Sequence, residues 1–123
     1  MRINTDDRFL SLERVEPQGT GVVWQIQAAV ASEGCIVAVH GRATVRTTEE
    51  TPEQVADFTA HRAQRLDLML SKGGWLRLKR APGGRTLVRY RFGRLSAGAS
   101  LEGELRLEGE SAEACCRELG GLL

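Results

Sequence analysis

The chain has 123 residues, the size of one domain, and its 41% hydrophobic and 27% charged residues are ordinary for a folded globular protein. This composition excludes a wholly disordered chain, and a core of this size needs neither a structural metal nor disulfides. Seventeen basic and sixteen acidic residues give a net charge of +1, which argues against a surface built throughout for nucleic acid or anionic lipid. We expect a single domain over residues 1–123, on which only a local patch could bind a polyanion.

The sequence carries no pattern typical of a signal peptide or a membrane span. Residues 1–8 hold acids where a signal peptide needs an apolar segment, and no uncharged stretch approaches the roughly 18 apolar residues that cross a membrane. Three cysteines, Cys35, Cys115 and Cys116, leave at least one thiol unpaired, and adjacent cysteines are poorly placed to bridge each other. We expect a cytoplasmic protein in a reducing compartment, without membrane contact. Arginine predominates over lysine, as is typical of a GC-rich bacterial genome.

The first elements in chain order are predicted strands. Residues 9–15 form a weak strand pattern, whereas residues 22–31 and 35–47 alternate cleanly between apolar and polar positions. Ser32, Glu33 and Gly34 join the two long runs, and this short connection predicts a tight hairpin. The core-facing residues expected on the hairpin are Trp24, Ile26, Ala28, Val30, Cys35, Val37, Val39, Ala43 and Val45.

A long helix is predicted next. Thr51 offers a capping hydroxyl, Pro52 suits the first helical position, and Gln54 follows the cap by three residues. Apolar residues then recur at helical spacing as far as the sequence Lys72-Gly73-Gly74, which resembles a helix end. We expect a helix over residues 52–71. It would pack on the sheet through Val55, Phe58, Leu66 and Met69.

The rest of the chain predicts a three-stranded meander and a closing helix. Residues 75–80 and 85–94 flank a turn rich in proline and glycine, and residues 99–108 alternate as a third strand. A helix over residues 111–122, capped by Ser111, would carry an apolar stripe and leave Cys116 exposed and oxidisable. The residues of that stripe are Ala112, Cys115, Leu119 and Leu122.

These elements predict an α+β domain in the order β-β-β-α-β-β-β-α. Its mostly antiparallel sheet would have five or six strands, with the long helix and the C-terminal helix on one face. An alternative is a strongly curled sheet wrapped around the long helix.

The second half of the chain also carries a family resemblance. The residues concerned are Gly73-Gly74-Trp75-Leu76-Arg77-Leu78, and Leu105-Arg106-Leu107-Glu108-Gly109-Glu110 before the terminal helix. With the order of elements over residues 20–123, they resemble uncharacterised, mainly actinobacterial families grouped near immunity proteins of the WapI contact-dependent toxins. The resemblance implies a toxin-neutralising or similar protein-binding role. It implies no catalytic residue and no cofactor.

The strongest local signal is a basic segment. Residues 73–101 contain seven basic side chains and no acid, with aromatic residues between them. Such a face could neutralise phosphates while aromatic rings stack on bases. Alternation nevertheless places Tyr90 and Phe92 opposite Arg89 and Arg91, and the acids of the next strand can pair with the arginines, so we favour a solvated, ion-paired face. The candidate binding residues are Arg77, Lys79, Arg85, Arg89, Arg91 and Arg94, with Arg80 as the seventh basic residue.

Catalytic and metal-binding patterns are weak. His40 and His61 lie on different elements, and the adjacent cysteines lack the spacing that lets two thiolates bind one zinc ion. Cys35 and His40 are five residues apart on one strand, so their side chains should point to opposite faces. The sequence from Gly19 to Gly21 begins like a nucleotide-binding turn but leads into a strand, so we interpret it as a plain turn. We therefore predict no metal, no cofactor and no enzymatic activity.

The resulting hypothesis is a non-enzymatic bacterial protein-binding domain, with an immunity-type protein that neutralises a partner toxin as its specific form. The alternative is a nucleic-acid-binding domain that uses the basic segment at residues 77–94. The sequence does not define an oligomeric state.

Overall fold

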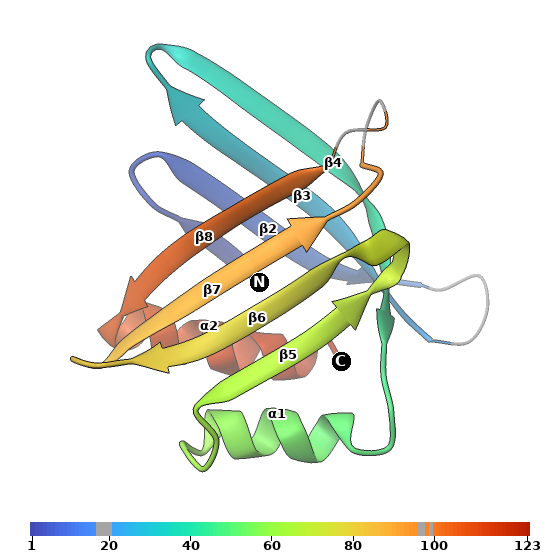
Figure 1. Cartoon of the computed structure of the whole chain (residues 1–123), viewed down its shortest axis with the longest axis vertical. Coiled ribbons are helices and arrows are strands. Elements are labelled where there is room, and N and C mark those ends of the chain that lie inside the picture. Colours follow the sequence, from blue (N-terminus) through green and yellow to red (C-terminus); the bar gives the residue numbers. More distant parts are fainter. Residues whose placement is uncertain (17–20, 96–97, 99) are drawn as a thin grey trace.

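The structure is a computed structural model that describes residues 1–16, 21–95, 98 and 100–123. Within these residues, eight strands form one antiparallel sheet in sequence order, and two helices accompany it (Figure 1). The α+β class and the antiparallel sheet are confirmed, whereas the expected five or six strands were too few. The strands are β1 (Arg2–Asn4), β2 (Arg8–Val15), β3 (Val22–Ser32), β4 (Cys35–Arg46), β5 (Arg65–Leu70), β6 (Trp75–Ala81), β7 (Arg85–Phe92) and β8 (Leu101–Glu108). The helices are α1 (Thr51–Thr59) and α2 (Gly109–Gly121), with a short 3-10 turn, η1 (Ser71–Gly73).

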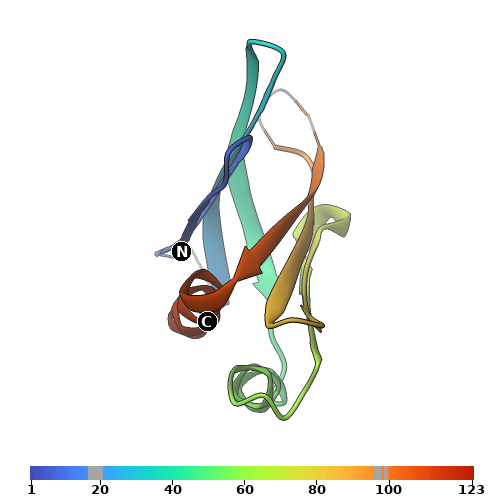
Figure 2. The same ribbon diagram turned by 90° about the vertical axis from the view of Figure 1, so that its left-hand side faces the viewer.

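The sheet bends so that its two halves face each other. Figure 2 shows β1–β4 as one layer and β5–β8 as the other, with the inner faces enclosing one hydrophobic core. The sheet remains open, with β1 and β8 at its two edges. The strong bend matches the alternative of a curled sheet, but both helices lie at one end of the layers rather than along an enclosed axis (Figure 2).

The predicted helix over residues 52–71 is wrong in its second half. The α1 helix ends at Thr59, and the chain turns through His61, whose φ of 61° lies in the left-handed region, before β5 begins at Arg65. Leu66, Leu68 and Leu70 are buried in β5, while Met69, expected to pack inward, is 48% exposed. The apolar spacing fits both periods over this stretch, and pairing of β5 with β6 satisfies the backbone in the strand form.

The predicted helix end at residues 72–74 is also wrong. Lys72 and Gly73 have φ values of 60° and 74°, and they join β5 to β6 instead of ending a helix. Left-handed backbone at two successive residues suits a tight turn as well as a helix end, so the sequence alone could not separate them.

The predicted start of α1 is correct in place but not in mechanism, and α2 starts two residues before the predicted residue 111. The α1 helix begins at Thr51, but the Thr51 hydroxyl accepts a hydrogen bond from the N–H of Thr48 at 2.8 Å and caps no helical amide. It therefore fixes the loop before the helix. The α2 helix begins at Gly109, so Ser111 lies inside its first turn and makes no cap.

The predicted β3–β4 hairpin is confirmed in its faces and, to within one residue, in its bounds. The pairing runs from Val22 opposite Val45 to Ser32 opposite Cys35. Glu33 and Gly34 form the two-residue turn with φ values of 50° and 75°, the backbone that two-residue hairpins favour. The weaker strand expected at residues 9–15 is β2, and it pairs with β3 along its whole length.

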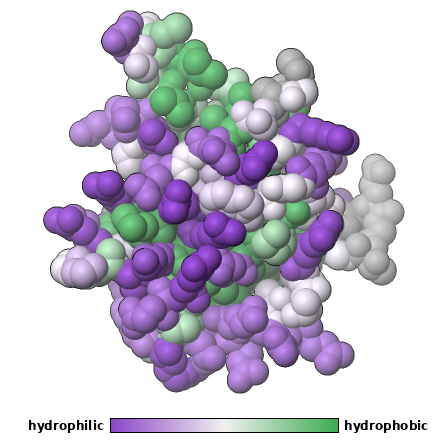
Figure 3. Space-filling view, viewed as in Figure 1, coloured by the Kyte–Doolittle hydropathy of each residue, from purple (hydrophilic) through white to green (hydrophobic). Residues whose placement is uncertain are grey.

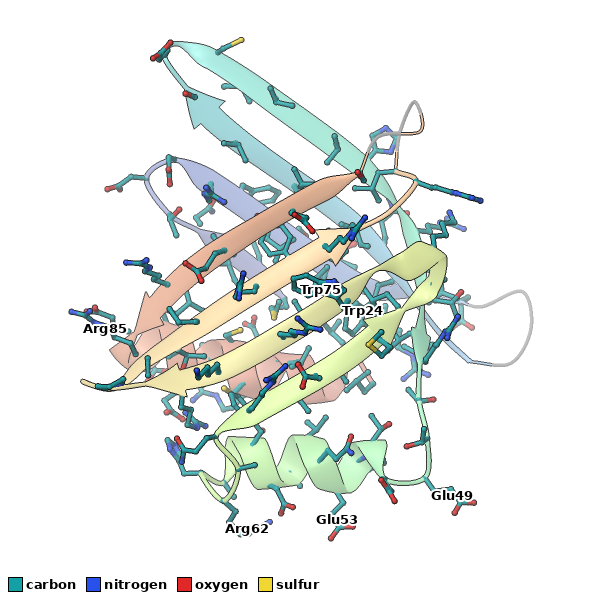
Figure 4. All side chains as sticks on the ribbon, viewed as in Figure 1. Trp24, Glu49, Glu53, Arg62, Trp75 and Arg85 are labelled. Carbon is teal, nitrogen blue, oxygen red and sulfur yellow. The ribbon has the colours of Figure 1, made fainter. Side chains whose placement is uncertain are left out.

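Strand side chains hold the C-terminal ends of both helices. Trp24 of β3 is labelled in Figure 4. Its buried indole N–H donates to the carbonyl oxygen of Leu122 at 3.0 Å. The Arg80 guanidinium of β6 donates to the carbonyl oxygen of Phe58 at 2.6 Å and stacks 4.6 Å from the centre of its ring. Carbonyl groups at helix C-termini lack hydrogen-bond donors within the helix. These contacts supply the missing donors and also orient the helices.

We expect Trp24→Phe to lower the free energy of unfolding by about 2–3 kcal/mol, because the buried Leu122 carbonyl loses its donor and a void remains. Urea unfolding followed by circular dichroism measures the loss. Trp75→Phe is the matched control, since Trp75 lies half-buried on the outer face of β6, and it should cost less than about 1 kcal/mol. Equal losses in the two variants would show that the indole hydrogen bond contributes little.

Candidate functional site

The predicted basic residues lie mainly on the outer face of the β5–β8 half. In β6 and β7 they occupy the positions that alternate with the buried residues, and polar side chains cover this side of the molecule (Figure 3). Arg94 lies just after β7, outside the ladder of paired strands, and is exposed. The outward residues of the set are Arg77, Lys79, Arg85, Arg89 and Arg91.

Acids on neighbouring strands pair with most of these arginines. Arg89 and Arg91 lie opposite Glu104 and Glu102 of β8, with 3.7 Å between nitrogen and oxygen in each pair. The cross-strand pairs expected from the sequence are therefore confirmed. Two further pairs extend the pattern, between Arg85 and Glu108 at 2.9 Å and between Arg77 and Asp67 at 3.2 Å.

The aromatic residues of the segment do not form a stacking platform. Tyr90 and Phe92 are buried on the inner face, where their rings stack with centres 5.2 Å apart, as expected from alternation. Burial raises the pKa of Tyr90. Trp75 is on the outer face, but the Arg77 guanidinium covers its ring at 4.4 Å. A base could stack there only by displacing Arg77.

The outer face nevertheless keeps an excess of positive charge. Its positions on β5–β8 hold seven basic and four acidic side chains. Lys79 lies between Arg65 of β5 and Leu87 of β7, so its immediate cross-strand neighbours include no acid. The face is an ion-paired network with a modest positive surplus.

A second candidate surface is the hairpin apex, defined as residues 29–38. This end of β3 and β4 projects beyond the rest of the sheet (Figure 1), and apolar side chains are visible there in Figure 3. Ile36 is 73% exposed and Val37 is 60% exposed. The two residues lie on opposite faces of β4, so both faces of the apex are apolar.

Sequence reasoning assigned Val37 and Cys35 to the core, and they do lie on the inner face. They are exposed because β4 pairs with β5 only through Val45 and Arg46, so the opposite layer does not extend over the apex. One signal in the sequence could have revealed this surface: the run from Cys35 to Val39 is apolar at every position. A strand with one solvated face would alternate between apolar and polar residues.

A groove of about 710 Å³ separates the two helices. Its residues include Thr48, Thr51, Val55, Cys116, Gly120 and Leu123. Cys116 is only 1% exposed, so the predicted exposed thiol is wrong: α2 packs against α1 as well as against β7 and β8, and it buries more than one stripe. Burial raises the pKa of Cys116, and it raises the pKa of Cys115 to about 12.

The histidines are well separated. His61 Nε2 lies 3.3 Å from Glu113 Oε1 of α2, whereas His40 is on β4 opposite Gln27. Cys35 and His40 occupy opposite faces of β4, as predicted. Within the described parts of the chain, no group of three potential metal ligands converges. The predicted turn at Gly19 and Thr20 falls outside the described residues.

Comparison with protein-family profiles, curated proteins and solved structures finds no match for this chain. The resemblance to the immunity families therefore stays a prediction. Among the described residues, no helix has the length and apolar character required to cross a membrane.

We expect one thiol of the folded protein to react rapidly with a disulfide reagent at pH 8, because Cys35 is exposed while Cys115 and Cys116 are buried with raised pKa values. All three should react in guanidinium chloride. Cys35→Ser should remove the rapid phase. Rapid reaction of two thiols in the native protein would contradict the burial of Cys116.

Reversing a charge on the outer face tests the ion pairs. We expect Arg91→Glu to lower the free energy of unfolding by about 0.2–1 kcal/mol, because it places two acids opposite each other, and Glu102→Arg to restore most of the loss. Thermal unfolding at low salt measures both effects. Lys79→Glu is the control and should cost nothing, since its cross-strand neighbour Arg65 gains an acid. Failure of the double variant to recover would show that the pair contributes no stability.

Proposed function

We propose that the protein is a non-enzymatic, protein-binding domain whose contact surface is the hairpin apex. The observation that carries the proposal is the exposure of Ile36 and Val37 on opposite faces of one projecting hairpin. Exposed apolar surface of this kind is disfavoured in water and commonly marks a site of protein association.

The chemistry of the apex supports a protein partner over a polyanion. Residues 34–39 carry no charged side chain, so this surface has nothing to attract phosphates. Ile36 and Val37 are β-branched and lose little rotamer freedom when they are covered. A partner could contact both faces of the hairpin, and each face would contribute apolar contacts.

The finer form of the proposal is an immunity-type role in the bacterial cytoplasm. It rests on the family resemblance of residues 73–78 and 105–110, and a protein that neutralises a toxin needs a binding surface and no catalytic centre. The near-neutral net charge is compatible with such a role.

A second candidate function is nucleic-acid binding by the outer face of β5–β8. The seven basic side chains against four acidic ones favour it. The ion pairs of Arg77, Arg85, Arg89 and Arg91 weaken it, because phosphates would have to compete with acids already in place. The inward position of Tyr90 and Phe92 weakens it further.

The proposed function predicts that a photoreactive amino acid at position 36 cross-links to a different protein in host cells. Ile36→Asp should abolish co-purification of that protein, because a charge on the apex would have to be desolvated. The matched control is the same photoreactive residue at Met69, an exposed apolar position on β5, which should give no such product. Equal products at both positions, or none at position 36, would overturn the proposal.

The two functions also differ in their response to salt and to charge reversal. If the outer face holds nucleic acid, Arg89→Glu and Arg91→Glu abolish binding of a single-stranded oligonucleotide, and binding falls steeply as salt rises. Sub-micromolar binding at physiological salt that both variants lose would make nucleic-acid binding the leading function.

A further inference from the structure

The helix groove is the space of about 710 Å³ between α1 and α2, lined by parts of residues 47–62 and 116–123. It lies at the opposite end of the molecule from the hairpin apex (Figure 1), and Figure 2 shows both helices nearly end-on. Its volume falls within the roughly 300–1,000 Å³ that is typical of small-molecule sites. A preformed cavity of this size can therefore enclose a small ligand.

The two helices run antiparallel along the helix groove. Thr51 and Pro52 at the start of α1 line the groove together with Leu123, which follows α2. At the other end, His61 Nε2 lies 3.3 Å from Glu113 Oε1 of α2. The groove therefore has two different ends, the Leu123 end and the His61 end.

The walls of the helix groove are mostly small and apolar. Among the described residues that line it, all except threonines and two arginines are apolar, and none is aromatic. Val55 and Cys116 contribute buried surface from α1 and α2. Gly120 also lines the groove, and a Cβ atom added there would meet no heavy atom within 4 Å. Such walls suit a narrow aliphatic chain.

The charged side chains that line the helix groove are both positive. They are Arg62 and Arg117, and no acidic side chain of the described residues lines it. Arg62 follows His61, and Arg117 lies one helical turn beyond Glu113 on the same face of α2, so both belong to the His61 end. Charge complementarity at this end favours an anion.

The existing ion pairs leave donors free on both arginines. Arg62 uses its Nε toward Asp57 at 2.9 Å, and Arg117 uses one terminal nitrogen toward Glu110 at 2.7 Å. Neither acid is among the residues that line the groove. A guanidinium group has five N–H donors, so an anion can bind the remaining donors without displacing Asp57 or Glu110.

A third guanidinium lies behind the floor of the groove. Arg80 of β6 contacts Phe58 of α1. Burial raises the pKa of the Cys116 thiol, and the neighbouring Arg80 opposes that rise. Within the described part of the chain, no carboxylate forms an ion pair with Arg80, and its Nε is buried without a hydrogen-bond partner. Its charge therefore adds to the attraction of an anion.

We propose that the helix groove binds one small amphipathic carboxylate, an aliphatic acid whose chain lies along Val55 and Gly120 and whose carboxylate contacts Arg62 and Arg117. The nine residues of α1 rise about 13 Å, which suits a chain of medium length such as that of decanoate. This site goes beyond the proposed function, because it lies away from the hairpin apex and takes a small molecule instead of a protein.

Isothermal titration calorimetry of the whole protein tests the ligand class. We expect one decanoate per chain, bound about fifteenfold more tightly than octanoate, because each of the two added methylene groups contributes about fourfold. Decanol should bind at least several-fold more weakly than decanoate, and decyltrimethylammonium should not bind measurably. No binding of decanoate at millimolar concentration, or equal binding of either uncharged or cationic analogue, would overturn the proposal.

Two adjacent glycines test the location. Gly120→Leu should abolish binding of decanoate, because the new side chain has space to enter the groove. Gly121→Leu is the matched control and should leave the affinity unchanged, since Gly121 is equally open but is not among the residues that line the groove. Both variants should remain folded, because leucine favours a helix more than glycine does. Binding that survives Gly120→Leu, or that both variants lose equally, would exclude this site.

Arg117→Gln tests the contact with the carboxylate. It should weaken binding of decanoate at least several-fold and leave binding of decanol unchanged, because only the charged ligand loses a charge-assisted hydrogen bond. Arg106→Gln, which changes an exposed arginine on β8, is the control and should alter neither affinity. An equal effect of Arg117→Gln on decanoate and decanol would contradict the proposed position of the carboxylate.

The same variants separate this inference from the proposed function. Gly120→Leu should keep the cross-link at position 36, and Ile36→Asp should keep binding of decanoate. A protein that cross-links at position 36 but does not bind decanoate removes the ligand site and leaves the proposed function intact. A protein that binds decanoate but gives no product at position 36 leaves the ligand site intact and removes the proposed function.

Discussion

The short junction between β4 and β5 determines most of this molecule's shape. Only Val45 and Arg46 of β4 pair with β5, and the Thr44 N–H bond to Ser71 adds one further link. Because α1 is inserted between these two strands, they leave the junction in different directions and the sheet divides into two facing layers (Figure 2). The core fills the space near the junction, where Trp24, Tyr90 and Leu105 are fully or almost fully buried.

The same junction explains why one end of the molecule is covered and the other is not. Near the junction, α1 and α2 lie against the layers, and Trp24 and Arg80 donate to carbonyl oxygens at the ends of these helices. Farther along β4, the second layer has diverged and neither α1 nor α2 lies there, so Ile36 and Val37 remain exposed (Figure 2). The apolar apex is therefore a consequence of the divergence and not of an unusual local conformation.

The outer face of β5–β8 illustrates how neighbouring strands change the meaning of a charge pattern. Read along one strand, Arg85, Arg89 and Arg91 form a basic stripe that could bind phosphates. In the sheet, each lies opposite an acid of β8, and the stripe becomes a set of exposed ion pairs of small individual stability. The acids were visible in the sequence, which is why this pairing could be predicted.

Local sequence patterns were sufficient to predict secondary structure where a pattern fits only one kind of element. The period of two predicted β3, β4 and β7 with their faces, and Pro52 predicted the start of α1. They were insufficient at residues 60–70, because leucines spaced for both periods become a strand only when β6 supplies hydrogen-bond partners. They also failed at Cys116, because its burial depends on the packing of α2 against α1, which is distant in sequence.

The sequence by itself determined the α+β class, the antiparallel pairing of neighbouring strands and which side chains share a face, because these depend on spacing within a few residues. The tertiary structure alone decided which apolar faces are covered. Val37 and Val45 occupy the same face of β4, yet Val45 is buried and Val37 is exposed, because only Val45 lies where the second layer is close. Burial depends on residues distant in sequence, and a periodic pattern contains no information about whether they reach a given strand.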